Sequence, residues 1–354
     1  MRSRVAGLLI AAGCGGHAST PDASPFPPVA PTRDVDVLFV IGSEESMGDA
    51  QTVLAGNLPS LVAGLDALPG GRPDLHLGVI DSSVDLGVAG LGASCSPATL
   101  GNGLLRNAAT GTPGCPTPID RFISDVANGS SARTTNYPGT LDDVLTCIVQ
   151  VGTTGCGFIA PLEAMKRALD GSRPENAGFR RAGAVLAVVI LSDEDDCSAS
   201  DPSLFTLDKT TAGDGSFRCT ALGYTCDQPI SVTQAGSYGS CVPRNDYLTD
   251  PRSYAAFLET LVNPAQLVVT VIAAPASTSI ETIALTQGPA AIALAPTCTA
   301  PINGDRMPVD PSIRLLAFAN ATSSPMLPTM CQSDYSALAT AIAVQIGVAM
   351  TAAP

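Results

Sequence analysis

The sequence has no tryptophan, few other aromatic residues and few basic residues. Aromatic side chains make up only 4% of the chain, which leaves little material for the ring-lined cleft of a sugar-binding site. Only 18 Lys and Arg stand against 32 Asp and Glu, so the formal net charge is -14. No basic stripe is available to follow a phosphate backbone, which argues against nucleic acid as a partner. The excess of acidic residues suits the binding of cations or basic surfaces, and it is also typical of a solvated surface that aids solubility.

The chain also lacks the motifs of common catalytic and nucleotide sites. Neither GxGxxG nor GxxxxGK[ST] occurs. The two histidines are His17, in a polar segment, and His76, in an expected strand where an ordinary packed histidine is the simplest interpretation. No Ser-His-Asp arrangement can be assembled from them. We therefore predict that the protein is not an enzyme, with a hydrolase that pairs Glu44 with Asp193 as the least favoured alternative.

The first residues have the pattern of an exported protein. Arg2 and Arg4 precede an apolar run over residues 5–12, the charged-then-apolar order of a secretory signal, and the run is too short to span a bilayer. The tripeptide Ala12-Gly13-Cys14 resembles a bacterial lipobox, in which the cysteine is acylated and becomes the new N-terminus. We predict a signal segment over residues 1–14 with lipidation at Cys14. Ordinary signal cleavage elsewhere is the alternative.

The cysteine count supports export independently. There are 11 cysteines, and setting Cys14 aside leaves an even number, which is typical of disulfide bonds formed in an oxidising compartment. A zinc site is disfavoured because no close-set cysteine pair faces another such pair. Proximity along the chain predicts five bonds: Cys95–Cys115, Cys147–Cys156, Cys219–Cys226, Cys197–Cys241 and Cys298–Cys331.

The remaining chain divides into a tether and one large domain. Residues 15–33 are rich in Ser, Thr, Pro and Ala and predict an extended tether that holds the domain off a membrane. In the domain, four short apolar runs indicate strands buried on both faces, as in a parallel sheet covered by helices. These runs are Val35–Ile41, Leu75–Ile80, Val185–Leu191 and Leu267–Ala273.

Apolar residues at helical spacing predict three helices around these strands. They run from Met47 to Leu68, from Phe158 to Leu169 and from Tyr335 to Met350, and Pro59 is expected to kink or divide the first. The alternation predicts an α/β fold with a doubly wound, mostly parallel central sheet that binds ligands at the carboxyl ends of its strands. Two cysteine-bearing segments, at about 90–129 and 201–250, do not fit the alternation and are predicted to be disulfide-stapled loop insertions.

The first expected strand leads into a recognisable loop. Val37–Ile41 followed by Gly42-Ser43-Glu44-Glu45-Ser46 resembles the first strand and metal loop of a von Willebrand factor type A (VWA) domain, where an Asp-x-Ser-x-Ser motif is expected. Gly42 stands in place of the Asp and Glu44 in place of the first Ser, whereas the second Ser is kept as Ser46. The motif is therefore degenerate.

Two further segments carry the same resemblance. The run Val188–Asp193 resembles the later strand of the family, which ends in a metal-site Asp and maps that residue onto Asp193. Thr153-Thr154-Gly155 resembles the loop that donates the family's Thr, with Thr154 as the preferred counterpart and Thr153 as the alternative. The resemblance covers residues 34–350 and implies a Rossmann-like VWA fold interrupted by the two insertions.

The resemblance implies a divalent-metal site formed by Glu44, Ser46, Thr154 and Asp193. Hydroxyl and carboxylate oxygens suit Ca²⁺ or Mg²⁺, and Ca²⁺ tolerates the shift caused by the longer Glu44 side chain better. Two interpretations stay open: an altered but working metal site, or a degenerate site kept as a loop platform. The neighbouring acidic run, Asp193 to Asp196, is interpreted as a solvated turn rather than a calcium loop, because it lacks the glycine and terminal glutamate of an EF-hand.

These observations together predict a non-catalytic lipoprotein of the bacterial cell envelope, in the outer membrane or facing the periplasm. Its VWA-like domain is expected to mediate protein binding or adhesion, with an unidentified protein or surface polymer as its partner. The protein is expected to contact the membrane only through its N-terminal lipid. The alternative is a scaffold subunit of an envelope complex with a vestigial metal site.

Overall fold

A six-stranded sheet forms the centre of the protein in a computed structural model, which describes residues 31–97, 100–110, 113–129, 132–213, 215–285, 292–302 and 305–351. The strand order is β4-β3-β2-β1-β5-β9. Four strands are parallel, namely β1 (Asp34–Ile41), β2 (Asp74–Asp81), β5 (Val185–Leu191) and β9 (Leu267–Ile272). Antiparallel β3 (Ile123–Ala127) and β4 (Arg133–Thr135) extend one edge. The predicted α/β class with a mostly parallel sheet is confirmed, and all four predicted runs lie in its parallel part.

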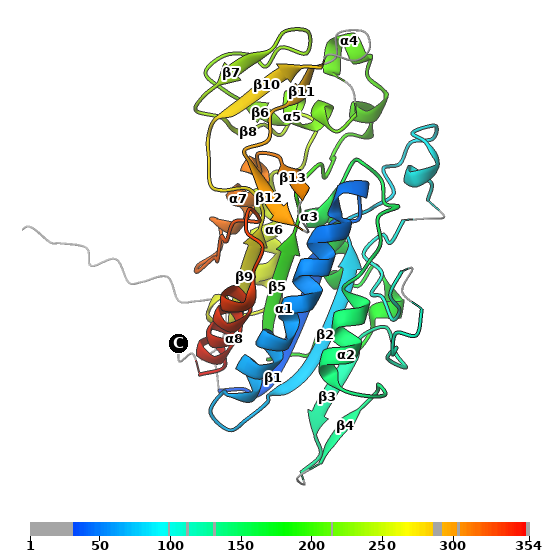
Figure 1. Ribbon diagram of the computed structural model, residues 1–354, viewed down its shortest axis with the longest axis vertical. Coiled ribbons are helices and arrows are strands. Elements are labelled where there is room, and N and C mark those ends of the chain that lie inside the picture. Colours follow the sequence, from blue (N-terminus) through cyan, green and yellow to red (C-terminus); the bar gives the residue numbers. More distant parts are fainter. Residues whose placement is uncertain are drawn as a thin grey trace, which may run out of the picture.

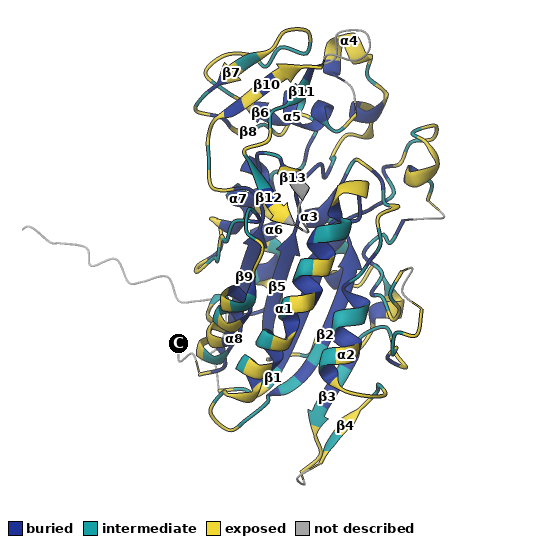
Figure 2. Ribbon diagram, in the orientation of Figure 1, coloured by how far each residue is buried: buried dark blue, intermediate teal, exposed yellow. Residues whose placement is uncertain are grey.

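Helices cover both faces of this sheet (Figure 1). Alternate residues of β1 point to opposite faces, as the pleat of a strand requires. Phe39 and its neighbours at odd positions pack among residues of α1 (Gly48–Asp66), α2 (Leu141–Ile148) and α8 (Ser336–Thr351). Leu38 and Val40 pack on the other face among residues of α3 (Pro161–Leu169), α6 (Pro251–Leu261) and α7 (Ile313–Ala319). The sheet is therefore buried between two apolar cores, which explains its continuous apolar strands (Figure 2).

Helix α1 is a single helix that continues through Pro59. The prediction that this proline divides the segment is wrong. A proline inside a helix leaves the carbonyl four residues before it without its usual donor, here that of Ala55. The Thr146 hydroxyl of the neighbouring α2 donates to this carbonyl at 3.5 Å, so the packing of α2 replaces part of the lost bonding.

Several elements of the fold were not predicted from the sequence. Helices α2, α6 and α7 are short, at 8, 11 and 7 residues, so each offers few repeats of an apolar stripe. Strand β3 lies within the segment at 90–129 that was expected to be a loop insertion, and it pairs with β2. The segment expected to be a loop insertion therefore includes a strand of the central sheet near its end.

Smaller elements lie above the carboxyl ends of the parallel strands in Figure 1. Strands β10 (Ile280–Ala284), β11 (Ile292–Leu294) and β7 (Gly236–Tyr238) form one small sheet, and two strand pairs accompany it: β12 (Cys298–Ile302) with β13 (Asp305–Val309), and β6 (Tyr224–Thr225) with β8 (Val242–Pro243). Further short helices are spread along the whole chain. They are α4 (Lys209–Ala212), α5 (Phe217–Gly223) and the 3₁₀ turns η1 (Glu45–Met47), η2 (Ala93–Cys95), η3 (Pro174–Asn176), η4 (Pro202–Thr206) and η5 (Pro264–Gln266). The segment at 201–250 thus has secondary structure of its own.

Ten cysteines form five disulfide bonds, but four of the five predicted pairings are wrong. The bonds are Cys95–Cys156, Cys115–Cys147, Cys197–Cys219, Cys226–Cys241 and Cys298–Cys331. Only Cys298–Cys331 agrees with the prediction. Sequence proximity did not decide the pairing, because the fold brings Cys95 to Cys156 across a sequence separation of 61 residues, whereas Cys197 bonds Cys219 at a separation of 22, nearer along the chain than the predicted Cys241. Disulfide bonds of this number are consistent with an exported protein.

Candidate functional site

The loops that follow β1, β2 and β5 meet with the segment 151–160 at one edge of the sheet. The backbone N–H of Gly42 donates to the carbonyl of Leu191 at 2.8 Å, and that of Ser82 donates to Ile41 at 3.0 Å. The Gly155 N–H donates to the Ser43 carbonyl at 2.7 Å. A Cβ atom at Gly155 would lie 2.1 Å from the Ser43 hydroxyl oxygen, so this close approach requires glycine. The predicted binding edge is therefore the place where these loops converge.

Glu44 fills the space that the absent side chain of Gly42 would occupy. A Cβ atom built at Gly42 would lie 2.6 Å from Oε1 of Glu44 and 2.9 Å from Cγ of Met47. The Glu44 side chain thus folds back over the first position of the loop. The carboxylate that is missing from position 42 in the sequence is replaced in space by the one from position 44.

The Glu44 carboxyl is buried against a second carboxyl. Glu44 is only 5% exposed and Asp193 only 3%. Burial raises the pKa of Glu44 well above its usual range, and repulsion from Asp193 and a hydrogen bond between the two side chains raise it further. Burial therefore favours the protonated form of Glu44, and a cation that binds between the two carboxyls would displace this proton.

Glu44 lines an open pocket of about 640 Å³, which we call the carboxyl-edge pocket. Its side chains include the carboxylates of Glu44, Glu45 and Glu194 and the hydroxyls of Ser46, Thr153 and Thr154. Of the predicted metal ligands, Glu44, Ser46 and Thr154 therefore share one pocket. Asp193 does not line it but lies next to Glu44, whose pKa it perturbs.

Gln51 in α1 fixes two of these loops relative to each other, and the sequence analysis missed its role. Its side-chain amide donates to the carbonyls of Gly42 and Gly152, each at 2.8 Å, and accepts from the Gly152 N–H at 3.1 Å. The residue is 3% exposed. Its position in an otherwise apolar helical stripe was the available signal, because a polar residue on a buried face needs hydrogen-bond partners.

The acidic run after β5 is not a solvated turn, which corrects the prediction. The Asp195 carboxylate accepts from the N–H groups of Arg314 at 2.7 Å and Leu315 at 2.9 Å, and from the Tyr224 hydroxyl, so it caps α7. Asp196 is 1% exposed and accepts from the Leu162 N–H at 3.1 Å near the start of α3. These two carboxylates are structural, because they hold the first turns of two helices against β5.

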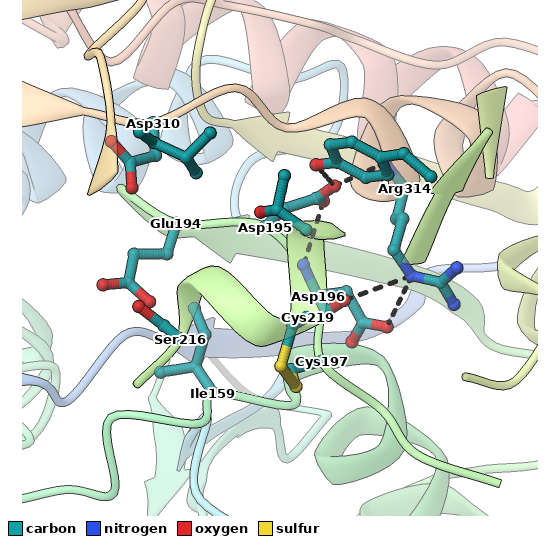
Figure 3. A pocket seen from close by; sticks show the side chains of 12 residues that line it. Ile159, Glu194, Asp195, Asp196, Cys197, Ser216, Cys219, Asp310 and Arg314 are labelled. Atoms are coloured by element: carbon teal, nitrogen blue, oxygen red, sulfur yellow. Dashed lines mark hydrogen bonds and ion pairs between the residues drawn. A yellow bond between two sulfur atoms is a disulfide. The ribbon is translucent and has the colours of Figure 1, made fainter. Parts of the chain in front are cut away.

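Glu194 lies between the carboxyl-edge pocket and a narrower pocket beneath the upper elements. Figure 3 shows the Glu194 side chain close to Ser216 in this second pocket, which Asp310 also lines. Burial and repulsion from Asp193 and Asp310 raise the pKa of Glu194 to about 8, and a hydrogen bond with Ser216 offsets part of the shift. Burial and Asp193 raise the pKa of Asp310 to about 7. The carboxyl groups of Glu194 and Asp310 therefore keep their protons to a higher pH than ordinary carboxyls do.

The remaining predicted residues fall away from this edge or outside the described residues. His76 lies in β2, where its Nδ1 is 2.8 Å from the Phe179 carbonyl oxygen, and burial lowers its pKa, as expected for a packed histidine. Cys14, His17 and the segment 1–14 lie outside the described residues, as does most of the predicted tether at 15–33. Within the described ranges, no helix has the length and apolar character to cross a membrane.

Comparison with known proteins does not assign a family. No protein-family model matches the chain, and no curated protein matches it. In the part of the chain that the structure describes, no group of three or more His, Cys, Asp or Glu side chains is arranged to hold a metal ion. The pair Glu44 and Asp193, with Ser46 and Thr154 nearby, provides the oxygen donors that hard divalent cations prefer.

Proposed function

We propose that this protein is a non-catalytic binding protein with a VWA-like domain, and that a partner docks at its carboxyl-edge pocket. The observation that carries the proposal is the Glu44 carboxyl, which is buried against Asp193 and takes the place of a side chain at Gly42. The strand order and the converging loops support it, because ligands of such sheets bind at the carboxyl ends of the strands.

The pocket has donors for an altered divalent-metal site. Glu44 and Asp193 would supply the charge, while the hydroxyls of Ser46 and Thr154, both exposed at the pocket, would supply neutral oxygens. When bound, Ca²⁺ or Mg²⁺ would act as a fixed positive charge that a partner's oxygen atoms can coordinate. Gln51 would hold the loop that carries Glu44 and Ser46 at a constant distance from the loop that carries Thr154.

We further propose that the protein is a lipoprotein of the cell envelope. Five disulfide bonds use ten of the 11 cysteines and leave Cys14, the residue of the lipobox-like tripeptide. This distribution supports export and a separate use for Cys14. The lipid would be the protein's contact with the membrane, and an unidentified envelope protein or surface polymer its partner.

Calorimetric titration of Ca²⁺, Mg²⁺ and Mn²⁺ into the oxidised protein tests the metal site. We expect one site that is lost in Glu44→Gln and Asp193→Asn and kept in Glu175→Gln, which removes an exposed carboxylate from η3. Equal binding in all four proteins would place the metal elsewhere. Absence of binding in the wild type would overturn the metal site and favour a scaffold role with a vestigial motif.

A further inference from the structure

Helix α8 exposes apolar side chains on the side that faces away from the sheet. None of its 16 residues is charged. One face of the helix packs into the core with α1, whereas Val344 and Val348, one helical turn apart, are 55% and 58% exposed. A surface helix normally carries charged or polar residues on its outer face. Within the described residues, this apolar face of α8 therefore has no covering element.

A groove of about 460 Å³ lies between this face of α8 and the turn that follows α1. Its apolar lining comes from Val344, Gly347, Val348, Leu68 and Pro69. A Cβ atom at Gly347 would lie 2.6 Å from Cδ2 of Leu68, so the glycine lets the two walls approach each other. Residues 31–33, the first that the structure describes, also line the groove. The groove is therefore largely apolar and lies where the N-terminal chain meets the domain.

Hydrogen bonds fix the start of the described chain at this groove. The Thr32 N–H donates to the Met350 carbonyl of α8 at 3.1 Å. The Arg33 guanidinium donates to the carbonyls of Pro69 at 2.9 Å and Gly71 at 2.7 Å, in the turn after α1. Thr32 is thus bound to one wall and Arg33 to the other. The chain that precedes them therefore begins at the groove itself.

The residues just before this anchor suit an apolar groove. Residues 25–30 have the sequence Pro-Phe-Pro-Pro-Val-Ala, which carries no charge and includes the first Phe, Tyr or Trp of the chain, Phe26. Prolines favour the polyproline II conformation, in which Phe26 and Val29, three residues apart, would point to the same side. Six residues separate Phe26 from Thr32, so an extended segment reaches about 19 Å along α8. Val344 lies only about 9 Å along the helix from the residue that binds Thr32.

We propose that residues 25–30 of this chain dock in the groove, with Phe26 and Val29 against the exposed valines of α8. Because the segment is joined covalently to the groove, its effective concentration there is on the order of millimolar. Its prolines reduce the conformational entropy that is lost on docking. Of the predicted tether, only residues 15–24 would then separate the domain from the membrane. The inference goes beyond the proposed function and does not depend on the carboxyl-edge pocket or on a metal.

Methyl NMR with a soluble nitroxide, which broadens the signals of exposed methyl groups, tests this docking. The sample is the oxidised protein labelled at Ile, Leu and Val methyls, as the Cys14→Ser variant so that no acyl chain competes for the groove. We expect the Val344 and Val348 methyls to be protected from the nitroxide, and to lose this protection in Phe26→Ser but keep it in Phe26→Leu. Ile119, which is 82% exposed, should be broadened equally in all three proteins.

The same spectra contain the outcomes that would overturn the inference. Val344 and Val348 signals broadened as strongly as that of Ile119 before any change at Phe26 would show that the groove is open. Protection that persists in Phe26→Ser would also overturn it, and its increase with protein concentration would identify a second copy as the occupant. Protection that appears only with phospholipid vesicles would assign the groove to the membrane. The methyl signals of the core report whether each variant is folded.

Discussion

At the residue scale, Glu44 supplies the carboxyl group that the loop lacks at Gly42. In sequence the loop has lost its first carboxylate, and in space Glu44 places one 2.6 Å from where the Gly42 Cβ would lie. A glutamate two residues later reaches the same volume because its side chain is longer and folds back over the loop. The degenerate motif therefore does not mean that the loop has lost its carboxyl group.

This geometry changes what restoring the family's aspartate would do. From the sequence, Gly42→Asp is expected to raise metal affinity, but in the structure its side chain would collide with Glu44 and Met47 and add another buried carboxylate. We predict that Gly42→Asp alone lowers the free energy of unfolding by about 1–3 kcal/mol, the usual cost of overpacking. Chemical denaturation would measure this loss.

The paired variant Gly42→Asp with Glu44→Ser is the matched control. It removes the collision with Glu44, which leaves only the flexible Met47 side chain to shift, and it recreates the Asp-x-Ser-x-Ser pattern. It should therefore recover much of the stability and bind Mg²⁺ more tightly than the wild type. A single Gly42→Asp variant that is as stable as the wild type would show that Glu44 does not hold this position in solution.

At the scale of elements, the acidic turn after β5 connects one strand to two helices. Successive carboxylates have different tasks: Asp193 faces the candidate site, while Asp195 and Asp196 accept hydrogen bonds from the first turns of α7 and α3. Burial raises the pKa of Asp195, and its hydrogen bonds with Tyr224, Arg314 and Leu315 counteract the shift. The turn therefore sets how these helices pack on the sheet.

Asp195→Ala should be strongly destabilising. It leaves two N–H groups of α7 without their acceptor and leaves the Tyr224 hydroxyl only the Pro311 carbonyl, so we expect a loss of about 3 kcal/mol in the free energy of unfolding. Asp208→Ala removes a comparable cap from the exposed α4, where water replaces the carboxylate, and should cost much less. Thermal or urea denaturation of both variants tests the contrast, and equal losses would contradict a structural role specific to the β5 turn.

For the whole molecule, the raised pKa values predict a stability that falls with pH. Folding raises the pKa of Glu194 from its ordinary 4.5 to about 8 and that of Asp310 from its ordinary 3.8 to about 7. Because the folded state binds these protons more tightly, their contribution is complete below the unfolded pKa values and is lost as pH rises through about 7 to 8. In a metal chelator, the melting temperature should therefore decrease between pH 6 and pH 9.

The variant Glu194→Gln with Asp310→Asn provides the control for this pH dependence. Its amides do not titrate, so its melting temperature should vary less over the same interval. A wild-type melting temperature that stays constant or increases from pH 6 to pH 9 would show that these carboxyls are not buried together as the structure places them.

Much of the central fold was predictable from local patterns. The four parallel strands appear as apolar runs because both of their faces are buried, and α1, α3 and α8 appear as helical stripes because one face of each packs on the sheet. The short α2 and α7 and the antiparallel strand β3 were not predicted, since few residues of each carry a periodic signal. At the candidate site, the sequence pointed to Glu44 and Asp193, and their role stays a prediction, whereas it did not indicate Gln51 or the capping roles of Asp195 and Asp196.

The sequence by itself determined the α/β class, the parallel strands and the even set of cysteines available for bonding, because hydrophobic periodicity and composition are local properties. Only the tertiary structure decided that Cys95 bonds Cys156, that Glu44 occupies the space beside Gly42, and that the acidic turn is buried. Each of these depends on the distance between segments that lie far apart in the chain or on how a side chain folds back. Such distances are set by the packing of helices and loops around the sheet, which no local pattern records.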